Sequence, residues 1–335
     1  MYNVGIIGCG AILIRHIEAI NENKKFTLKA LCDVDGNVLN DSYKNYGGNG
    51  YTDYQEMIDT GDINFVVVAT PNSLHFEQAK YALENGCDVL VEKPVSLNPK
   101  EVKLLSEIAD SNNRKAYTVL QVRLNPTVKS IRKVLDDGLL GKIRGISLTQ
   151  RWQRPYEYFT GWRSIPLIGG GTLYECGIHY MDVMCHLFGK PNVKSSMIYN
   201  TKHSDCEIED TIYSLLDFGE YGGSLEVTIS AEPSNVECSI AIMAEKGYIK
   251  LGGKALDKVE VSKFENPQAK IDFEKIMSSM GDSIKPNSYG DSDYQGSCPN
   301  HPNLYKNINN FRISESENVI ELIDEIYKLS DIKYY

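Results

Sequence analysis

Several signals that mark other classes of protein are missing from this chain. No apolar run approaches the roughly 18 residues that a membrane-spanning helix requires. No excess of basic residues is present, since Lys+Arg 35 against Asp+Glu 45 gives a formal net charge of −10, which disfavours nonspecific attraction to nucleic acid or anionic lipid. No internal repeat or low-complexity tract interrupts the 335 residues. We therefore expect a globular protein of about two domains that partners neither nucleic acid nor membrane.

Cysteine pairs are also missing. The eight cysteines form no C-x-x-C and no metal-finger spacing, so we predict neither a disulfide framework nor a metal site. Cysteines scattered singly through apolar runs are typical of small buried side chains in a reducing compartment. Residues 4–14 are apolar, but no basic segment precedes them and no small-residue cleavage site follows. We therefore expect a soluble, cytoplasmic protein.

Residues 1–121 alternate short apolar runs with amphipathic stretches of helical length. The apolar runs are 3–7, 28–33, 64–69, 88–92 and 116–120. This alternation predicts a parallel sheet with crossover helices. One helix is expected over 73–84, with Ser73 as a candidate N-cap and Gly86 just past its end, and a second over 98–110.

The pattern changes in residues 122–335. Runs rich in β-branched residues are joined by turn-length links, which predicts an antiparallel sheet. The predicted strands are 143–152, 209–218, 223–231, 236–243 and 247–251, and the predicted helices are 126–137, 172–187, 302–312 and 316–329. Residues 278–300 are rich in Ser, Gly, Asp and Asn and predict a long loop. We expect an α+β domain with an open, mainly antiparallel sheet.

A glycine motif follows the first predicted strand directly. Gly8-Cys9-Gly10 opens a helix, and glycines in this position let the backbone approach a pyrophosphate at the helix N-terminus. The third fingerprint position, normally Gly or Ala, is Leu13, so a plain strand-to-helix turn stays an alternative. Asp33 ends the second strand, where a carboxylate binds the adenine-ribose hydroxyls and repels a 2′-phosphate. This favours NAD over NADP in a Rossmann domain, with Asp35 as the alternative contact.

Two further strand ends of the first half carry polar groups. Thr70, Asn72 and His75 follow the run at 64–69 and are candidates to line a cofactor channel, although Asn72 or Ser73 could instead cap the helix. Lys93 precedes Pro94 and is therefore biased towards extended backbone. Its ammonium at a strand end can stabilise a developing alkoxide, whereas a solvated surface lysine is the ordinary alternative.

The second half adds a carboxylate, an imidazole and an arginine-rich segment. Glu175 and His179 are four residues apart in a predicted helix, where the imidazole can accept a proton near neutral pH and the carboxylate can hold its tautomer. A structural histidine is the alternative. Residues 150–163 concentrate arginine with aromatic side chains, which suits either an anionic ligand with planar rings or an oligomer interface.

Glu92-Lys93-Pro94 and the carboxylate-x-x-x-His element at 175–179, in this order after the glycine motif, resemble the glucose-fructose oxidoreductase, inositol dehydrogenase and rhizopine-catabolism (Gfo/Idh/MocA) family. The resemblance covers essentially the whole chain. It implies that Lys93 and His179 flank the reacting hydroxyl and that Glu175 replaces the more common Asp. The residues expected to bind NAD are Gly8, Gly10, Ala11, Ile12, Asp33, Thr70, Asn72, His75, Glu92, Lys93, Gln121, Trp162 and Arg163.

Within the family, several segments resemble the bacterial UDP-N-acetylglucosaminuronate 3-dehydrogenases of the WlbA/WbpB type. These segments are residues 154–158, 161–163, 170–171, 177–182, 207–211, 245–247 and 301–307. This implies oxidation at C3 of a UDP-sugar with NAD in surface-polysaccharide synthesis, a homotetramer, and 2-oxoglutarate as a candidate for cofactor recycling. The expected substrate contacts are Lys93, Arg123, Asn125, Tyr158, Arg163, Glu175, His179, His301 and Tyr305. Oxidation of another sugar, sugar phosphate or polyol and a non-catalytic nucleotide-binding regulator are the alternatives.

Overall fold

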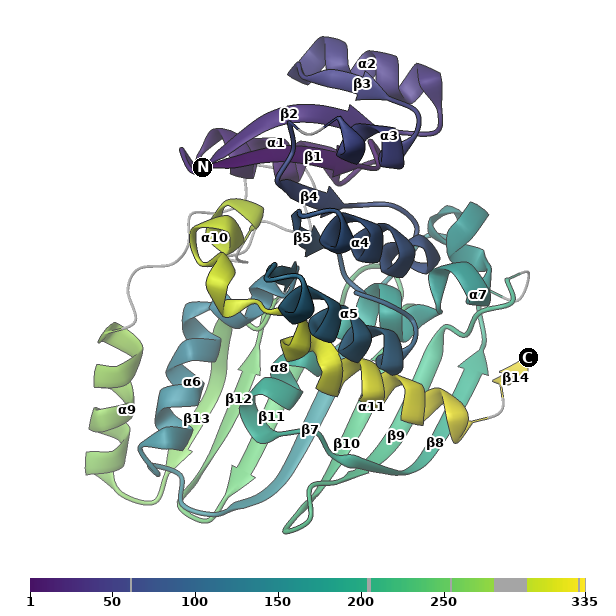
Figure 1. Cartoon of the computed structure of the whole chain (residues 1–335). Coiled ribbons are helices and arrows are strands. Elements are labelled where there is room, and N and C mark those ends of the chain that lie inside the picture. Colours follow the sequence, from purple (N-terminus) through teal and green to yellow (C-terminus); the bar gives the residue numbers. More distant parts are fainter. Residues whose placement is uncertain (61, 204–205, 254, 280–299, 331, 335) are drawn as a thin grey trace. The chain divides into compact units, whose positions relative to one another are not determined.

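The computed structural model describes residues 1–335 except 61, 204–205, 254, 280–299, 331 and 335 (Figure 1). Most of the loop predicted at 278–300 therefore lies outside the described residues. The chain forms two compact units. The first comprises Met1–Leu120, Leu167–Gly169 and Asn300–Ile320, and the second comprises Gln121–Pro166, Gly170–Pro299 and Glu321–Tyr335.

The first unit contains a six-stranded parallel sheet in the order β3-β2-β1-β4-β5-β6 (Figure 1). Its strands are β1 Tyr2–Ile7, β2 Phe26–Cys32, β3 Asn49–Tyr51, β4 Phe65–Val68, β5 Asp88–Val91 and β6 Ala116–Thr118. Its helices include α1 Leu13–Asn21, α2 Gly36–Tyr46, α3 Tyr54–Asp59, α4 His75–Glu84, α5 Pro99–Ser111 and α10 His301–Lys306. All residues of β4 and β5 are buried, as expected for parallel strands covered on both faces. The predicted α/β Rossmann dinucleotide-binding domain, a parallel sheet with crossover helices, is confirmed.

The strand order reverses at β1, which pairs with β2 on one side and β4 on the other. Ligands of such sheets bind at the carboxyl ends of the strands, next to this reversal. The carboxyl ends of β1, β2 and β4 lead into Gly8, Asp33 and Ala69. The fold of the first unit thus brings the glycine turn, Asp33 and the start of the segment with Thr70 to one edge of the sheet.

The start of the helix predicted at 73–84 differs from expectation. A short 3₁₀ turn, Asn72–Leu74, precedes α4, and the residue at the N-cap position of α4 is Leu74. The prediction that Ser73 caps this helix is therefore wrong. The Asn72 side chain instead donates a hydrogen bond to the carbonyl of Gly169, at 2.8 Å.

The second unit contains an eight-stranded sheet in the order β13-β12-β11-β7-β10-β9-β8-β14. The strands are β7 Ile143–Arg151, β8 Asn192–Asn200, β9 Thr211–Asp217, β10 Gly222–Thr228, β11 Glu237–Ala244, β12 Gly247–Gly252, β13 Lys258–Phe264 and β14 Ile332–Tyr334. Neighbouring strands are antiparallel except for β7 with β10 and β8 with β14. The predicted open, mainly antiparallel sheet is confirmed, although β8, β13 and β14 were not predicted.

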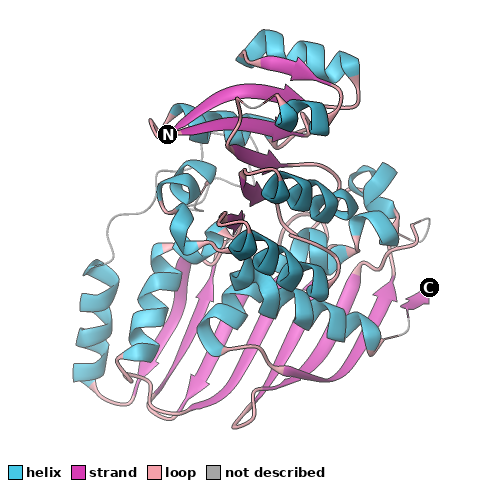
Figure 2. Ribbon diagram, viewed as in Figure 1, coloured by secondary structure: helices cyan, strands magenta, loops and turns pink. Residues whose placement is uncertain are grey.

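Helices cover one face of this sheet (Figure 2). The remaining helices of the chain are α6 Pro126–Asp136, α7 Pro166–Gly169, α8 Ile178–Phe188, α9 Pro267–Ser279 and α11 Glu317–Lys328. Short 3₁₀ segments span Gln121–Leu124, Tyr156–Phe159, Gly161–Ser164, Ile308–Asn310 and Ile313–Ser316, and a π-helix spans Leu173–Gly177. Within the described residues, no helix has the length and apolar character needed to cross a bilayer.

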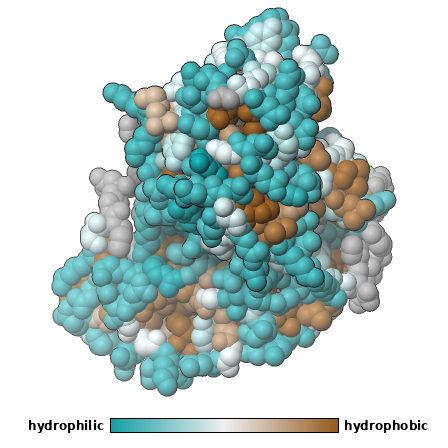
Figure 3. Space-filling view, in the orientation of Figure 1, coloured by the Kyte–Doolittle hydropathy of each residue, from teal (hydrophilic) through white to brown (hydrophobic). Residues whose placement is uncertain are grey.

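Several large apolar side chains of the eight-stranded sheet are exposed. Met197, Leu215 and Met243 are 50%, 59% and 54% exposed, although each belongs to a strand with a buried alternate face. The face of the molecule shown in Figure 3 is largely hydrophilic, in keeping with the charged composition. The seven described cysteines are buried and free, which confirms their prediction as small core side chains.

Candidate active site

The glycine turn after β1 leaves room for a phosphate. Gly8 has φ +100°, and a Cβ at this position would lie 2.4 Å from the carbonyl oxygen of Ala69, so the close contact between the ends of β1 and β4 requires glycine. A Cβ at Gly10 would meet nothing within 4 Å. The N-cap of α1, Ile12, provides no side-chain cap. The open turn and the uncapped helix terminus fit the pyrophosphate of a dinucleotide.

The Asp33 carboxylate lies beside this turn. Its Oδ2 accepts a hydrogen bond from the Cys9 N–H at 2.8 Å, and its Oδ1 accepts one from the Asp35 N–H at 2.9 Å. Asp35 instead caps α2, because its Oδ1 accepts from the Asn37 N–H at 2.8 Å. Of the two candidate ribose contacts, the geometry favours Asp33, whose charge fits NAD.

His75 connects two loops that were predicted to line the cofactor site. The ring is buried, with Nδ1 2.7 Å from the Pro94 carbonyl oxygen and Nε2 2.8 Å from the Thr70 carbonyl oxygen. A neutral ring donates to one of these carbonyls at a time. Burial lowers the pKa of His75, which favours this neutral ring. Both nitrogens therefore face the protein backbone, and the ring lies between the end of β4 and the segment carrying Lys93.

Glu92 is the centre of a buried hydrogen-bond network. Its Oε1 lies 3.1 Å from His16 Nε2 and 2.8 Å from His301 Nε2, while its Oε2 accepts from the Lys93 N–H at 3.2 Å. His16 Nδ1 lies 2.9 Å from the Tyr305 hydroxyl. Despite burial, the donors from His16 and His301 hold the pKa of Glu92 well below its usual value. The network thus fixes the residue that precedes the predicted catalytic lysine.

The same network contains residue types that bind metals. Nitrogen and carboxylate oxygen atoms of His16, Glu92 and His301 lie within 4.8 Å of one another. These atoms are already engaged in hydrogen bonds with each other, which satisfies them without an ion. His301 and Tyr305, expected to contact substrate, are 6% and 2% exposed. Within the first unit, the structure therefore places both side chains in this internal network.

Glu175 and His179 lie on two different kinds of helix. Glu175 belongs to the π-helix Leu173–Gly177, and His179 belongs to the first turn of α8. The single helix predicted over 172–187 is therefore two segments, and the side-chain spacing of an ideal α-helix does not apply between them. Single π turns within α-helices occur frequently at functional sites. Glu175 is buried and His179 is half-buried.

Arg163 forms a cluster with two aromatic rings and Glu175. Its Nε donates to Glu175 Oε2 at 3.3 Å, and its guanidinium lies 4.4 Å and 5.1 Å from the ring centroids of Trp162 and Tyr158. The Tyr158 hydroxyl donates to the same carboxylate oxygen at 3.4 Å, and burial raises the pKa of Tyr158. The second unit thus brings together an arginine, a carboxylate and two aromatic surfaces.

Other predicted residues of the second unit have internal partners. Arg123 makes two hydrogen bonds to Asp182 of α8, from Nε at 2.7 Å and from Nη2 at 2.6 Å. Asn125 caps α6 and donates to the Ala255 carbonyl at 3.1 Å. Gln121 begins the 3₁₀ segment that contains Arg123. The Arg123–Asp182 pair anchors the helix that carries His179.

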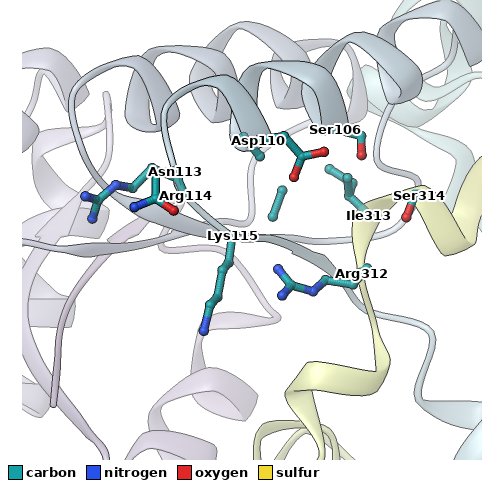
Figure 4. A pocket seen from close by; sticks show the side chains of 10 residues that line it. Ser106, Asp110, Asn113, Arg114, Lys115, Arg312, Ile313 and Ser314 are labelled. Carbon is teal, nitrogen blue, oxygen red and sulfur yellow. The ribbon is translucent and has the colours of Figure 1, made fainter.

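A cavity of about 400 Å³ lies elsewhere in the first unit. It is lined by the end of α5, the start of β6 and residues 312–314, with Asp110, Lys115 and Arg312 among its side chains (Figure 4). Lys115 precedes β6, so the cavity is at the amino end of this parallel strand. Cofactor chemistry in such sheets belongs to the carboxyl ends, and we therefore do not place the cofactor here.

Two family models match the chain. The model of the oxidoreductase family with a NAD-binding Rossmann fold matches residues 2–120, and the GFO/IDH/MocA C-terminal domain matches residues 128–250. Together they cover more than half of the sequence. The chain belongs to the GFO/IDH/MocA oxidoreductase family. NAD is its cofactor, in agreement with the glycine turn and Asp33.

Two curated relatives match part of the chain. Oxidoreductase P35 of Formosa agariphila is 30% identical over 61% of this chain and 64% of its own length. The scyllo-inositol 2-dehydrogenase (NADP(+)) IolW of Bacillus subtilis is 28% identical over 51% of this chain and 49% of its own length. The match thus spans about half to two thirds of these relatives.

A solved structure matches nearly the full chain. The WlbA dehydrogenase from Bordetella pertussis, in complex with NADH and UDP-GlcNAcA, has a TM-score of 0.82 and 25% identity, covering 98% of this chain and 95% of that one. The likeness therefore extends over the residues of both units.

The sequence analysis missed His16. It lies on the buried face of α1 and is 0% exposed. A histidine on the apolar face of the helix after a glycine motif is a signal that could have been noticed, because a buried imidazole requires a partner. Its partner, Glu92, was predicted only as a neighbour of the cofactor.

Proposed function

We propose that this protein oxidises the C3 hydroxyl of a UDP-linked N-acetylhexosaminuronic acid with NAD, in the synthesis of surface-polysaccharide sugars. The observation that carries the proposal is the near full-length likeness to WlbA with NADH and UDP-GlcNAcA, at 25% identity and a TM-score of 0.82. The segment expected to contact an anionic, ring-containing ligand also forms a compact cluster around Arg163. Arginine beside aromatic rings and a carboxylate suits a sugar nucleotide.

His179 acts as the general base in this mechanism. A half-buried imidazole on the first turn of α8 can accept the hydroxyl proton near neutral pH. Lys93 stabilises the negative charge that develops on the sugar oxygen. Bound NAD supplies the nicotinamide ring that accepts a hydride from the sugar carbon. Lys93→Ala and His179→Ala, compared over a range of pH, distinguish this assignment from one in which the two roles are exchanged.

Glu175 orients the substrate side of the site. Its buried carboxylate accepts from Arg163 and Tyr158, which sets the position of the guanidinium over the Trp162 ring. We propose Tyr158, Trp162 and Arg163 as contacts of the sugar nucleotide and the nicotinamide end. For Arg123, Asn125, His301 and Tyr305, whose polar groups have internal partners, we propose a supporting role.

We also propose a homotetramer in the cytoplasm. The exposed Met197, Leu215 and Met243 on the eight-stranded sheet favour contact with another copy of the chain. The buried free cysteines favour a reducing compartment. The proposed subunit number is tested by light scattering after size exclusion, where Leu215→Glu and Met243→Glu should yield smaller species. Reduction of 2-oxoglutarate by the enzyme with NADH bound is proposed as the route that recycles the cofactor.

A second candidate is the oxidation of a polyol or another sugar without the nucleotide. The likeness to the scyllo-inositol 2-dehydrogenase favours it, and the same Lys93 and His179 would serve. Calorimetric titration of the NADH-loaded protein with UDP and with scyllo-inositol separates the two. Binding of UDP, weakened by Arg163→Ala, supports the nucleotide sugar; binding of the polyol alone would replace it.

A further inference from the structure

The segment that carries Glu175 and His179 begins at two glycines with left-handed backbone. Gly170 has φ +84° and Gly171 has φ +97°. A Cβ on Gly171 would lie 2.6 Å from the Tyr327 hydroxyl and 2.8 Å from Glu209 Oε2. Both the backbone angle and the lack of space therefore require glycine. The chain enters the π-helix pressed against a carboxylate and a phenol from two other parts of the second unit.

The first N–H groups of this segment are bonded by these side chains. The Thr172 N–H donates to Glu209 Oε1 at 2.7 Å, and the Leu173 N–H donates to the Tyr327 hydroxyl at 3.1 Å. The Tyr327 hydroxyl donates in turn to Glu209 Oε1 at 2.5 Å. The Thr172 hydroxyl donates to the Glu209 carbonyl at 2.5 Å. The start of the segment is thus held by hydrogen bonds to both Glu209 and Tyr327.

We propose that Glu209 and Tyr327 are positioning residues, which cap the start of the π-helix and thereby set the positions of Glu175 and His179, and that the ionised form of Glu209 is the one that holds the cap. This inference rests on the proposed function, because that function gives His179 its role as the general base. Glu175 follows Thr172 by less than one π turn, and its N–H donates to the Gly171 carbonyl at 3.1 Å. A shift at the cap is therefore passed directly to the Glu175 carboxylate.

The charge of Glu209 supports the second part of the proposal. An anion at a helix N-terminus is favoured by the exposed N–H groups and the helix dipole. Burial raises the pKa of Glu209 to about 7, whereas the hydrogen bonds from Tyr327, Thr172 and Leu173 act in the opposite direction and favour the ionised carboxylate. Protonation near neutral pH therefore weakens these capping bonds while the side chain stays buried. The titratable groups at this contact are Tyr327 of α11 and Tyr174 of the π-helix, whose stacked rings have centroids 5.9 Å apart. Asp210 follows in sequence, but its carboxylate accepts from the N–H groups of the segment 201–203.

The test compares wild type with Glu209→Gln, Tyr327→Phe and, as a matched control on the same segment, the exposed Glu207→Gln. Hydrogen exchange of the Thr172 and Leu173 amides in the NADH-loaded protein needs no substrate. We expect Tyr327→Phe to speed exchange at Leu173 about tenfold, the effect of one lost hydrogen bond. In wild type and Glu207→Gln, the protection of the Thr172 amide, corrected for intrinsic exchange rates, should rise between pH 6 and pH 8, a range that spans the pKa of Glu209. In Glu209→Gln, this protection should not rise.

Turnover provides the second measurement. With the sugar nucleotide, the pH profile of kcat in wild type should contain, besides the ionisation of the general base, a second ionisation near pH 7 that Glu209→Gln lacks. The Kd for NADH should be the same in both proteins. Equal protection and equal pH profiles in wild type and Glu209→Gln would overturn the inference. Altered protection without turnover on any sugar nucleotide would instead overturn the proposed function and leave the cap in place.

Discussion

Replacing Glu92 by glutamine tests the network beside Lys93, the proposed catalytic lysine. The carboxylate accepts from the imidazole N–H groups of His16 and His301 through one oxygen and from the Lys93 N–H through the other. Glutamine has nearly the same volume but one oxygen and one NH₂ group. If its oxygen faces the histidines, its NH₂ faces the Lys93 N–H, so at least one buried donor loses its acceptor.

The magnitude follows from these contacts. A hydrogen bond to a charged group contributes about 1.5–3 kcal/mol, and an unsatisfied buried group adds to the loss. We therefore expect Glu92→Gln to lower the free energy of unfolding by about 2–4 kcal/mol at pH 7. The pKa of Glu92 is held well below 4.5, so its stabilising effect is complete above that pH and is lost as the pH falls below it. The difference between the two proteins should narrow in acid.

Urea unfolding followed by circular dichroism, at pH 7 and at stepwise lower pH, measures this effect. Glu77→Gln is the matched control, because Glu77 is exposed on α4 and should change stability by less than about 0.5 kcal/mol. The hydrogen-bond reasoning is refuted if Glu92→Gln is as stable as the control at pH 7, or if the difference does not narrow in acid.

Four further predictions concern both units. Tyr305→Phe removes the donor to His16 Nδ1 and should cost about 1–3 kcal/mol in chemical unfolding, whereas Tyr81→Phe, whose hydroxyl bond is exposed, should cost less than about 0.5. Because the pKa of Glu209 is raised to about 7, wild type should lose stability relative to Glu209→Gln as pH rises from about 4.5 to 7, by at most about 3 kcal/mol; a constant difference would contradict this. Asp33→Ser should weaken NAD binding and raise the relative affinity for NADP, measured by fluorescence titration; an unchanged ratio would argue against the ribose contact. Dialysis against EDTA should leave turnover and bound-metal analysis unchanged, since the buried His–Glu cluster is satisfied by hydrogen bonds; loss of activity restored by one metal would show a metal site.

Much of the fold could be predicted because short stretches of this sequence indicate which segments are buried. The runs at 64–69 and 88–92 are uniformly apolar, as two-sided burial in a parallel sheet requires, and they became β4 and β5. The strand β3 was missed because its three residues, Asn49–Tyr51, contain no apolar run. Strand β8 was missed because three consecutive polar residues, 194–196, interrupt its apolar pattern, whereas β13 begins with the alternation Lys-Val-Glu-Val, a signal that could have been noticed.

The candidate site was less predictable because its contacts are distant in sequence. Glu92 contacts His16 across 76 residues and His301 across 209, so no spacing rule relates them. The π-helix before α8 depends on Glu209 and Tyr327, which hold its start from elsewhere in the second unit. Local motifs therefore indicated candidate residues for the chemistry, whereas the side chains that contact these candidates could be identified only from the structure.

A direct assay of the proposed reaction tests whether the protein oxidises a sugar nucleotide with NAD. Purified protein is mixed with NAD and UDP-N-acetylglucosaminuronic acid, with and without 2-oxoglutarate, while NADH absorbance and the mass of the sugar nucleotide are followed. We expect a product lighter by the two hydrogen atoms of an alcohol oxidation, which Lys93→Ala and His179→Ala do not form. Tight NAD binding with no change in the mass of the sugar nucleotide would contradict the proposed substrate while leaving the family and the cofactor in place.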